Sequence, residues 1–328
     1  MERSTCAESV KDLSIAIPSW NTKNLLGQCL ESVGRSSAGL DLETIVVDNA
    51  SDDGSADMVA EKHPEAKLIR NRMNLGFAGA CNLAFKHSVG RYFLLLNTDT
   101  IILDDGLKSL VQFLDNHPDA GAAGCKLLNR DGTLQRSCSC FPGLLTELFD
   151  AVYLSKLFPK SRLFARYSMS YWDFDEVREV DFAGGSCLMV RREAIEEVGL
   201  LDESFFMYTE EADWCYRLWQ HGWKVYYFPG ARVIHLGGES ARRYGGDVLL
   251  HLYYGRNRFI RKHRGRAAAA AHRVIIGLGS LCRLCVHGVG RLVSANHREA
   301  VGFQARLLKW VIRGEREQDV KPNREVAL

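Results

Sequence analysis

The first 125 residues alternate short apolar runs with stretches in which apolar residues recur at helical spacing. The apolar runs, each of strand length, are Leu13–Ile17, Glu43–Val47, Ala66–Ile69, Tyr92–Leu96 and Gly121–Cys125. Between them, the spacing predicts helices over Asn24–Gly34, Ser55–His63, Gly79–Val89 and Leu107–His117. Strands that alternate with helices are typical of a mainly parallel sheet covered by helices, so we predict an α/β fold.

The pattern continues less regularly after residue 125. Residues 126–180 are rich in aromatics, and we interpret them as a partly helical segment that covers the substrate. A strand-like run then extends from Val180 to Val190. Further helices are expected near Glu193–Val198 and Glu210–His221, and further strands at Lys224–Phe228 and Arg232–His235. One α/β domain over residues 1–255 accounts for these elements.

The last part of the chain differs in charge from the rest. The formal net charge is +2, but residues 1–255 hold 26 Lys and Arg against 35 Asp and Glu, whereas residues 256–316 hold 14 against 2. A basic block on an acidic body indicates an anionic partner, either a lipid surface or nucleic acid. The basic residues lack an interleaved aromatic pattern, which makes nucleic acid the weaker interpretation.

Within this basic block, residues 267–293 have a helical pattern. Ser280, Arg283, His287 and Arg291 recur at steps of three or four among mainly apolar residues. We predict a helix that lies in a membrane interface with its apolar side toward the lipid, interrupted at its glycines. The alternative is a helix packed on the body or on a second copy of the chain. No apolar run of 18 residues is free of charge, so the expected membrane contact is peripheral.

Cysteine usage bears on the cellular compartment. Ten cysteines occur in a chain of 328 residues whose first eleven residues are polar and resemble no secretory signal. Reduced thiols in the cytoplasm are the favoured interpretation.

Polar residues follow the predicted strands at the sheet edge where ligands of such folds gather. They are Pro18-Ser19-Trp20-Asn21, Asp48 with the turn that follows it, Asn71–Asn74, and Asn97-Thr98-Asp99. A carboxylate such as Asp48 can accept hydrogen bonds from a base or ribose, although a turn and helix cap would use the same residues. Asp99, together with phosphate oxygens and waters, could hold Mg²⁺ or Mn²⁺, although it too could be an ordinary turn residue.

Two later segments add candidate chemistry. His235 ends an apolar strand, and its imidazole would complete a site suited to Mn²⁺ only if Asp99 lies nearby; a lone histidine is more often structural. Glu210, Glu211 and Asp213 open a helix, where acids are favoured by the helix dipole. Capping does not require three acids, so one of them is a candidate to take a proton from a hydroxyl.

In combination, these segments resemble family-2 glycosyltransferases, the inverting enzymes with a GT-A fold, and in particular their bacterial rhamnosyltransferase-like branch. The resemblance covers roughly residues 13–264. Its most specific stretches are Val180–Ser186, Val190–Glu193, Gly199–Phe206 and Thr209–Arg217. It implies a nucleotide-binding half at about 13–125, an acceptor half at 126–255 and a basic C-terminal region at 256–328.

The resemblance also implies roles for individual residues. Asp99 would be the remaining acid of the D-x-D metal motif and His235 the second metal contact, with Glu211 as base and Glu210 or Asp213 as alternatives. The implied nucleotide-sugar site comprises Pro18, Ser19, Asn21, Asp48, Asn74, Gly76, Asn97, Asp99, Gly184, Gly185 and Ser186. The expected cofactor is Mg²⁺ or Mn²⁺.

Two departures from the family pattern keep other functions open. Asn97 replaces the first aspartate of the metal motif, and Glu210-Glu211 stands where the family usually has Glu-Asp. The expected reaction moves a sugar, with dTDP-rhamnose as the favoured donor, to a glycan or polyprenyl-linked acceptor at the cytoplasmic face of the membrane. The alternatives are a catalytically silent sugar-nucleotide-binding scaffold and a nucleotidyltransferase. A processive synthase would carry several transmembrane helices and a Gln-x-x-Arg-Trp motif after the base, and neither is found.

Overall fold

The computed structural model describes residues 10–237, 248–290 and 295–313. Within residues 10–128 it confirms the predicted alternation of strands and helices. The elements are β1 (Leu13–Ser19), α1 (Lys23–Arg35), β2 (Leu42–Asp48), α2 (Ser55–Lys62), β3 (Lys67–Arg70), α3 (Gly76–Lys86), β4 (Tyr92–Leu96), β5 (Thr100–Ile102), α4 (Gly106–Asn116) and β6 (Ala120–Leu128). β5 is too short to have been predicted from an apolar run.

Most of the remaining elements before the C-terminal helices are short, apart from α8 and β12. They are β7 (Leu134–Gln135), β8 (Cys138–Ser139), α5 (Leu144–Ala151), α6 (Leu154–Leu157), β9 (Arg178–Glu179), β10 (Phe182–Ala183), β11 (Cys187–Arg191), α7 (Arg192–Val198), α8 (Glu210–Gln220), β12 (Lys224–His235), α10 (Val248–Gly290) and α11 (Ala295–Arg313). Residues 126–180 contain two short helices and several short strands, as the irregular pattern predicted.

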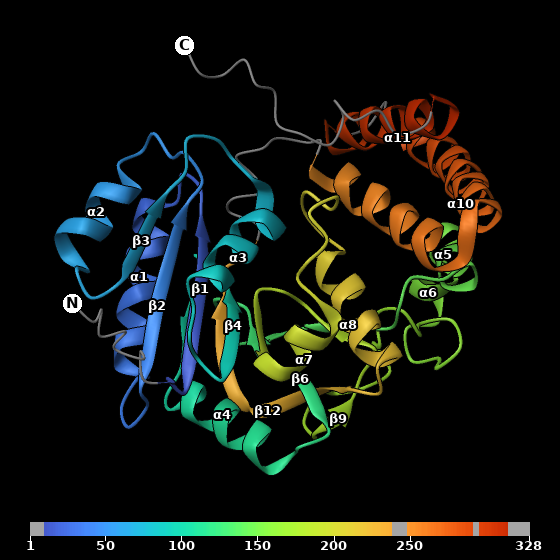
Figure 1. Ribbon diagram of the computed structural model, residues 1–328. Helices are drawn as coiled ribbons and strands as arrows, with labels where there is room; N and C mark the ends of the chain where they lie inside the picture. The colour runs from blue at the N-terminus through green and yellow to red at the C-terminus, as the bar shows by residue number, and fades with distance from the viewer. Residues whose placement is uncertain (1–9, 238–247, 291–294, 314–328) are drawn as a thin grey trace, which may run out of the picture.

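The central sheet has the strand order β3-β2-β1-β4-β11-β6-β12-β5 (Figure 1). The first four strands are parallel, and β12 is parallel to β6. β11 is antiparallel to both of its neighbours, β4 and β6, and β5 is antiparallel to β12. The sheet is therefore mostly parallel, with its helices packed against both faces.

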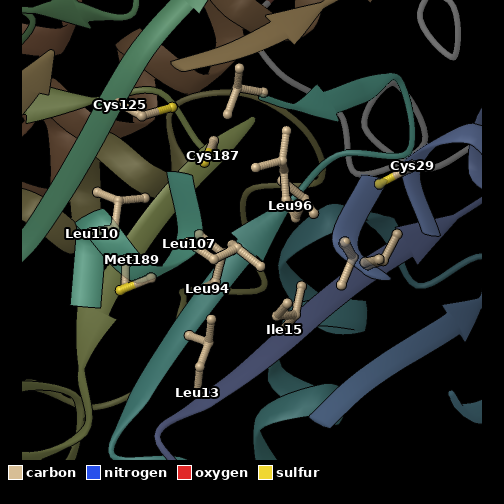
Figure 2. Close-up of a cluster of buried hydrophobic side chains, with 14 of the residues drawn as sticks. Leu13, Ile15, Cys29, Leu94, Leu96, Leu107, Leu110, Cys125, Cys187 and Met189 are labelled. Atoms are coloured by element: carbon tan, nitrogen blue, oxygen red, sulfur yellow. The ribbon is translucent and has the colours of Figure 1, made fainter. Parts of the chain in front are cut away.

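The apolar strands are buried on both faces, which explains why they appear as continuous runs rather than alternating patterns. Ile15 and Leu94 point to the face covered by α1, α2 and α4, where Figure 2 shows them with Met189 and Cys187 of β11. Ala16, Phe93 and Leu95 point to the opposite face, which α3, α7 and α8 cover. Removing a large side chain from either layer would cost about 2–5 kcal/mol of folding free energy.

Two predicted strand boundaries are wrong. The run from Val180 to Val190 is not one strand: β10 pairs with β8 in a separate two-stranded sheet, and Gly184–Ser186 form a loop before β11. Conversely, Lys224–Phe228 and Arg232–His235 belong to one strand, β12, whose register shifts between Phe228 and Arg232. The intervening Pro229-Gly230 bends the strand without ending it, because a β-bulge can absorb extra residues.

The C-terminal region forms α10, which lies beside α5, and α11, which packs against α10 (Figure 1). α10 bends at Gly265, whose φ of 87° is non-helical, and it continues as a helix through Gly277 and Gly279, where an interruption was expected. By length and composition, the stretch Leu249–Cys285 is sufficient to cross a bilayer. Of the residues predicted to form its polar face, His287 and Arg291 lie outside the described side chains.

The two residues of this predicted polar face that the structure describes, Ser280 and Arg283, do not face water. Ser280 is completely buried, and Arg283 donates a hydrogen bond to the backbone oxygen of Asp150 at 2.9 Å. Since Gly279 contacts α5 and Gly277 approaches α11, the side of α10 that carries Ser280 packs onto the protein together with the apolar Ile276.

Candidate active site

A cavity of about 270 Å³ opens at the carboxyl ends of β1 and β4. The N-termini of α3 and α8, the loop before β11 and the end of β12 complete its wall. Most of the predicted site residues line it: Pro18, Ser19, Asn74, Gly76, Asn97, Asp99, Gly184, Gly185, Ser186, Glu210, Glu211 and His235. Asn21, Asp48 and Asp213 do not line it.

Asp99 and His235 meet because the edge strand β5 pairs with β12. His235 lies opposite Thr100 in this pairing, and the N–H of Leu236 donates to the backbone oxygen of Asp99 at 2.8 Å. As a result, Nε2 of His235 lies 3.3 Å from Oδ1 of Asp99, with both side chains largely buried. The condition set for a metal-binding histidine, that Asp99 be close, is met.

Gln135 of β7 fixes the hydrogen-bonding state of this histidine. Its Nε2 donates to Oδ1 of Asn129 at 2.9 Å and to the backbone oxygen of His235 at 3.2 Å. Its Oε1 therefore faces Nδ1 of His235, at 2.5 Å, and must accept a hydrogen bond from the Nδ1–H. In neutral imidazole the lone pair is then on Nε2, the nitrogen that faces Asp99.

This arrangement fits a cation. Within the described residues, His235 Nε2 is a buried nitrogen without a hydrogen-bond partner, and it faces a carboxylate oxygen. Two acceptors in contact are stabilised by a positive charge, and metal-bound histidines usually donate their other N–H to an acceptor, as His235 does to Gln135. The described residues contain no cluster of three or more His, Cys, Asp or Glu suited to a metal. The protein thus offers two ligands, and a bound ligand or water would supply the rest.

Asn97 lies between this pair and the glycine loop. Its backbone N–H donates to the carbonyl of Ser186 at 3.0 Å, and its own carbonyl accepts from the Thr100 hydroxyl at 2.6 Å. Gly184 is held by a 2.7 Å hydrogen bond from its N–H to the carbonyl of Ser137. These bonds fix the loop against the end of β4, so that backbone of the loop borders the cavity.

The wall formed by the start of α3 requires a glycine. Gly76 has a φ of +74°, and a Cβ there would lie 2.6 Å from the carbonyl oxygen of Phe206. The Asn49 side chain donates to the Gly76 carbonyl at 3.2 Å, and Asn74 Oδ1 accepts from the Gly76 N–H at 2.8 Å. A larger residue would displace the segment that leads into α8.

Asn21 and Asp48 tie two loops together beside the cavity. Asn21 Oδ1 accepts from the N–H of Asp52 at 2.8 Å, and its own N–H donates to the Ser51 hydroxyl at 3.0 Å. Asp48 Oδ2 accepts from the N–H of Ser51 at 3.1 Å. Asp48 Oδ1 is buried and has no hydrogen-bond partner among the described residues, so this oxygen remains available to a donor group.

The two adjacent glutamates enter the cavity from a strained turn. Tyr208 and Thr209, which precede α8, have φ values of 67° and 75°. Such left-handed conformations are rare for residues other than glycine, and in a β-branched residue they require support from the surroundings. Gly255 of α10 packs against this turn, where a Cβ would lie 2.6 Å from the Thr209 hydroxyl and 2.7 Å from the Tyr208 carbonyl oxygen.

Burial gives the two glutamates unequal proton affinities. Burial raises the pKa of Glu210 well above its usual 4.5, and the negative charge of Glu211 raises it further. Burial also raises the pKa of Glu211, but backbone N–H groups, including that of Gly185, oppose the increase. The backbone N–H groups favour the charged form of Glu211, so Glu211 is the better candidate of the two for the ionised carboxyl.

Asp213 is not an alternative base. Its side chain is fully buried away from the cavity, with Oδ2 3.0 Å from Arg217 Nε and Oδ1 2.8 Å from both Lys262 Nζ and His263 Nε2. Burial alone would raise its pKa, but these hydrogen bonds and charges outweigh it and hold the pKa below its usual 3.8. Its position one helical turn after Glu210 places it on the side of α8 that contacts α10.

Several residues lining the cavity were not assigned a role from the sequence. Trp20, Asn49 and Thr98 adjoin predicted residues, whereas Phe77, Met207 and Tyr208 were missed. The dipeptide Met207-Tyr208 precedes the acidic helix, which could have pointed to it. Nothing in the local pattern marks Gln135, because its role arises only from the pairing of β7 with β6 beside the end of β12.

Two known proteins are similar to this chain in sequence. Over 222 residues the chain is 29% identical to the N-acetylglucosaminyl-diphospho-decaprenol L-rhamnosyltransferase of Mycobacterium tuberculosis, covering 64% of this chain and 71% of that protein. It is 26% identical over 222 residues to a low-salt glycan biosynthesis hexosyltransferase of Haloferax volcanii, covering 66% of each.

A solved structure shares the architecture. The mannosyltransferase of Pyrobaculum calidifontis, in complex with GDP-Man and Mn²⁺, superposes with a TM-score of 0.54 at 18% identity, covering 92% of this chain and 86% of that one. This likeness confirms the predicted GT-A fold. Residues 14–199, more than half of the chain, match the family described as glycosyl transferase family 2. They include the ends of β1 and β4 and the loop before β11, which border the cavity, and the chain belongs to glycosyl transferase family 2.

Proposed function

We propose that this glycosyltransferase moves a sugar from a nucleoside diphosphate to an acceptor hydroxyl, with inversion and with the help of a divalent metal ion. One observation carries the proposal: the Asp99–His235 pair and the Glu211 carboxyl open onto the same cavity. Pro18, Ser19, Asn74 and Gly76 would hold the nucleotide, with Asp48 and Asn21 supporting the adjoining loops. The glycine loop Gly184–Ser186 would border the transferred sugar.

Asp99 and His235 are the residues that would hold Mg²⁺ or Mn²⁺. When bound, the ion would neutralise negative charge on the diphosphate leaving group. With Asn97 in place of a second carboxylate, the protein contributes one anion and one imidazole, and the donor's phosphate oxygens are suited to complete the coordination.

Glu211 is proposed as the general base. Backbone N–H groups favour its charged form, and a carboxylate in the cavity can accept the proton of an acceptor hydroxyl as that oxygen attacks the sugar. A single displacement of this kind inverts the anomeric carbon. A protonated Glu210 would limit the negative charge next to the donor.

The substrate classes follow from the relatives. The mycobacterial protein is named for transfer of L-rhamnose to a diphospho-decaprenol-linked sugar. We therefore propose dTDP-rhamnose as the first donor to test, a polyprenyl-linked glycan as acceptor, and a location at the cytoplasmic face of the membrane. UDP- and GDP-sugars are the donors to compare.

A donor screen tests the proposal. Thermal unfolding with dTDP-, UDP- and GDP-sugars, with and without Mn²⁺, should show one nucleotide class that raises the midpoint in the presence of the ion, because a ligand of the folded state stabilises it. The same donor should then release its nucleoside diphosphate when a lipid-linked acceptor is added. Binding without metal-dependent release would indicate a silent scaffold instead, and release of pyrophosphate from a nucleoside triphosphate would indicate a nucleotidyltransferase.

A further inference from the structure

Two neighbouring helices carry apolar side chains on their outer surface. On α5, Leu145 is 65% exposed, and Leu148 and Val152, which follow at helical spacing, are 38% and 43% exposed. On the second half of α10, Val274, Leu278 and Leu281 are 59%, 58% and 51% exposed. The spacing of each set places its members along one side of its helix.

The two stripes adjoin each other. α10 crosses α5 where Gly279 meets Ala151: a Cβ at Gly279 would lie 2.7 Å from the Cβ of Ala151. Only small residues allow such a close approach of two helices. In sequence, Leu148 lies three residues before Ala151, and Leu278 directly precedes Gly279. In Figure 1, α5, α6 and α10 lie together at one side of the molecule, away from the strands β1–β3. We call these six apolar residues the α5–α10 face.

The side of α10 that faces inward carries buried polar residues as well as the apolar Ile276. His272 and Ser280 are completely buried, and Arg283, whose side chain is 12% exposed, contacts Asp150. Glu147 of α5 is buried too, against Arg256 at 3.3 Å and His272 at 3.6 Å. A helix on the surface of a protein in water usually has polar residues on its outer side, whereas Val274, Leu278 and Leu281 on the outer side of α10 are apolar. The α5–α10 face is therefore matched to an apolar surrounding.

The exposed charges around this face have one sign. Lys156, Lys160, Arg162 and Arg166 are exposed after α5, and Arg261, Arg264 and Arg266 are exposed at the bend of α10. Within residues 143–172 and 249–285 the acidic residues are Glu147 and Asp150, and both contact arginines. An apolar surface with a basic rim complements a bilayer with anionic headgroups. It does not complement a second copy of itself, because a symmetric contact would bring like charges together.

We propose that the α5–α10 face docks onto an anionic lipid bilayer, with its leucine and valine side chains among the upper acyl chains and its basic rim on the headgroups. This surface differs from the one expected from the sequence. It includes α5 and the segment after it, and Ser280 and Arg283 lie on its protein side. The inference deepens the proposed function by naming the surface that would meet a lipid-linked acceptor, but docking is measurable without any substrate.

Flotation of the full-length protein with phosphatidylcholine vesicles, with and without 30% phosphatidylglycerol, tests the proposal. We expect binding to the anionic vesicles that weakens as salt is added, since each basic residue near the surface contributes roughly fivefold in partition. The double variant Leu278→Asp/Leu281→Asp should reduce binding by at least about tenfold. Lys160→Glu/Arg162→Glu should reduce binding to anionic vesicles and leave the weak binding to neutral vesicles unchanged.

The matched control is Val10→Asp/Val177→Asp, which places the same charges at exposed apolar positions elsewhere and should bind like the unmodified protein. Thermal unfolding of each variant verifies that it is folded. Absence of binding by the unmodified protein, or equal binding by the Leu278/Leu281 variant, would overturn the proposal. So would a dimer in sedimentation velocity that this variant abolishes, because the face would then belong to a second copy.

A donor-binding measurement separates this inference from the proposed function. The Leu278/Leu281 variant should keep the thermal shift given by the nucleotide sugar and Mn²⁺, since neither residue lines the cavity. Flotation that succeeds with a protein that binds no nucleotide sugar would contradict the proposed function and leave the docking surface intact.

Discussion

The Nε2 atom of His235 lies 3.3 Å from Oδ1 of Asp99, and in the neutral imidazole this nitrogen carries the lone pair, because Nδ1–H donates to Gln135 Oε1. Gln135 thereby joins the Asp99–His235 pair as a third residue, on the side of the imidazole away from Asp99. Gln135 lies outside the cavity lining, yet its amide determines which nitrogen of the histidine can act as a ligand.

Gln135→Leu should weaken Mn²⁺ binding by about 10–100-fold, because the imidazole loses the acceptor that fixes its tautomer and orientation. Electron paramagnetic resonance of free Mn²⁺, measured in the presence of a nucleoside diphosphate, reports this affinity without any turnover. Gln135→Glu retains an acceptor for Nδ1 and should bind Mn²⁺ much more tightly than the leucine variant. Equal affinities for the two variants would show that Gln135 is only a packing residue.

The two adjacent glutamates should respond differently to the same substitution. Glu211→Gln removes the proposed base and should lower kcat by about 10²–10⁴-fold while nucleotide affinity stays unchanged. Glu210→Gln resembles the protonated carboxyl that burial favours, and it should retain most of the activity. Steady-state kinetics with a common donor compares them. A large loss in Glu210→Gln together with unimpaired Glu211→Gln would reverse the assignment.

Glu210 should also make stability depend on pH. Its pKa is raised in the folded state, so the folded protein holds a proton that the unfolded chain releases above about pH 4.5. Stability therefore falls as pH rises from that value toward the folded-state pKa. Relative to the unmodified protein, Glu210→Gln should unfold at a higher temperature at pH 8, with a difference that shrinks toward pH 4. A constant difference across this range would contradict the assignment.

Gly255→Ala should shift the turn at Tyr208 and Thr209 that leads into the cavity. The new methyl group would overlap the Tyr208 carbonyl oxygen and the Thr209 hydroxyl, so the turn that presents Glu210 and Glu211 must shift. We expect a loss of about 1–3 kcal/mol in the free energy of unfolding, from overpacking, together with a lower kcat. Gly34→Ala in α1 is the control: nothing lies within 4 Å of its Cβ position, and it should stabilise by about 0.5–1 kcal/mol. Denaturant unfolding and kinetics of both variants provide the comparison.

The sequence predicted the parallel half of the sheet well, because Leu13–Ile17 and Tyr92–Leu96 are apolar apart from Ser14, as expected of strands buried on both faces. It also predicted that residues at the ends of these strands share a site. Local pattern could not predict that β11 inserts antiparallel between β4 and β6, because strand order depends on long-range pairing.

The same limit applies to the contacts behind the site. The interaction of Gln135 with His235 spans 100 residues, and that of Asp213 with His263 spans 50. The periodicity of α10 identified its polar side but not which side faces the protein, since both orientations have the same spacing. The sequence therefore leaves Asp213 as a candidate base and predicts Ser280 on an outer face, whereas both side chains are completely buried.

The position of Asp213 between α8 and α10 bears on the length of the acceptor. Its carboxylate joins α8, which carries Glu211, to Lys262 and His263 of α10, and it does so through a buried ion cluster with little freedom to move. A bilayer held by the second half of α10 would thus lie at a set height from Glu211. The protein would then accept lipid-linked glycans whose terminal hydroxyl reaches that height, and it would not act on glycans that are too short or too long.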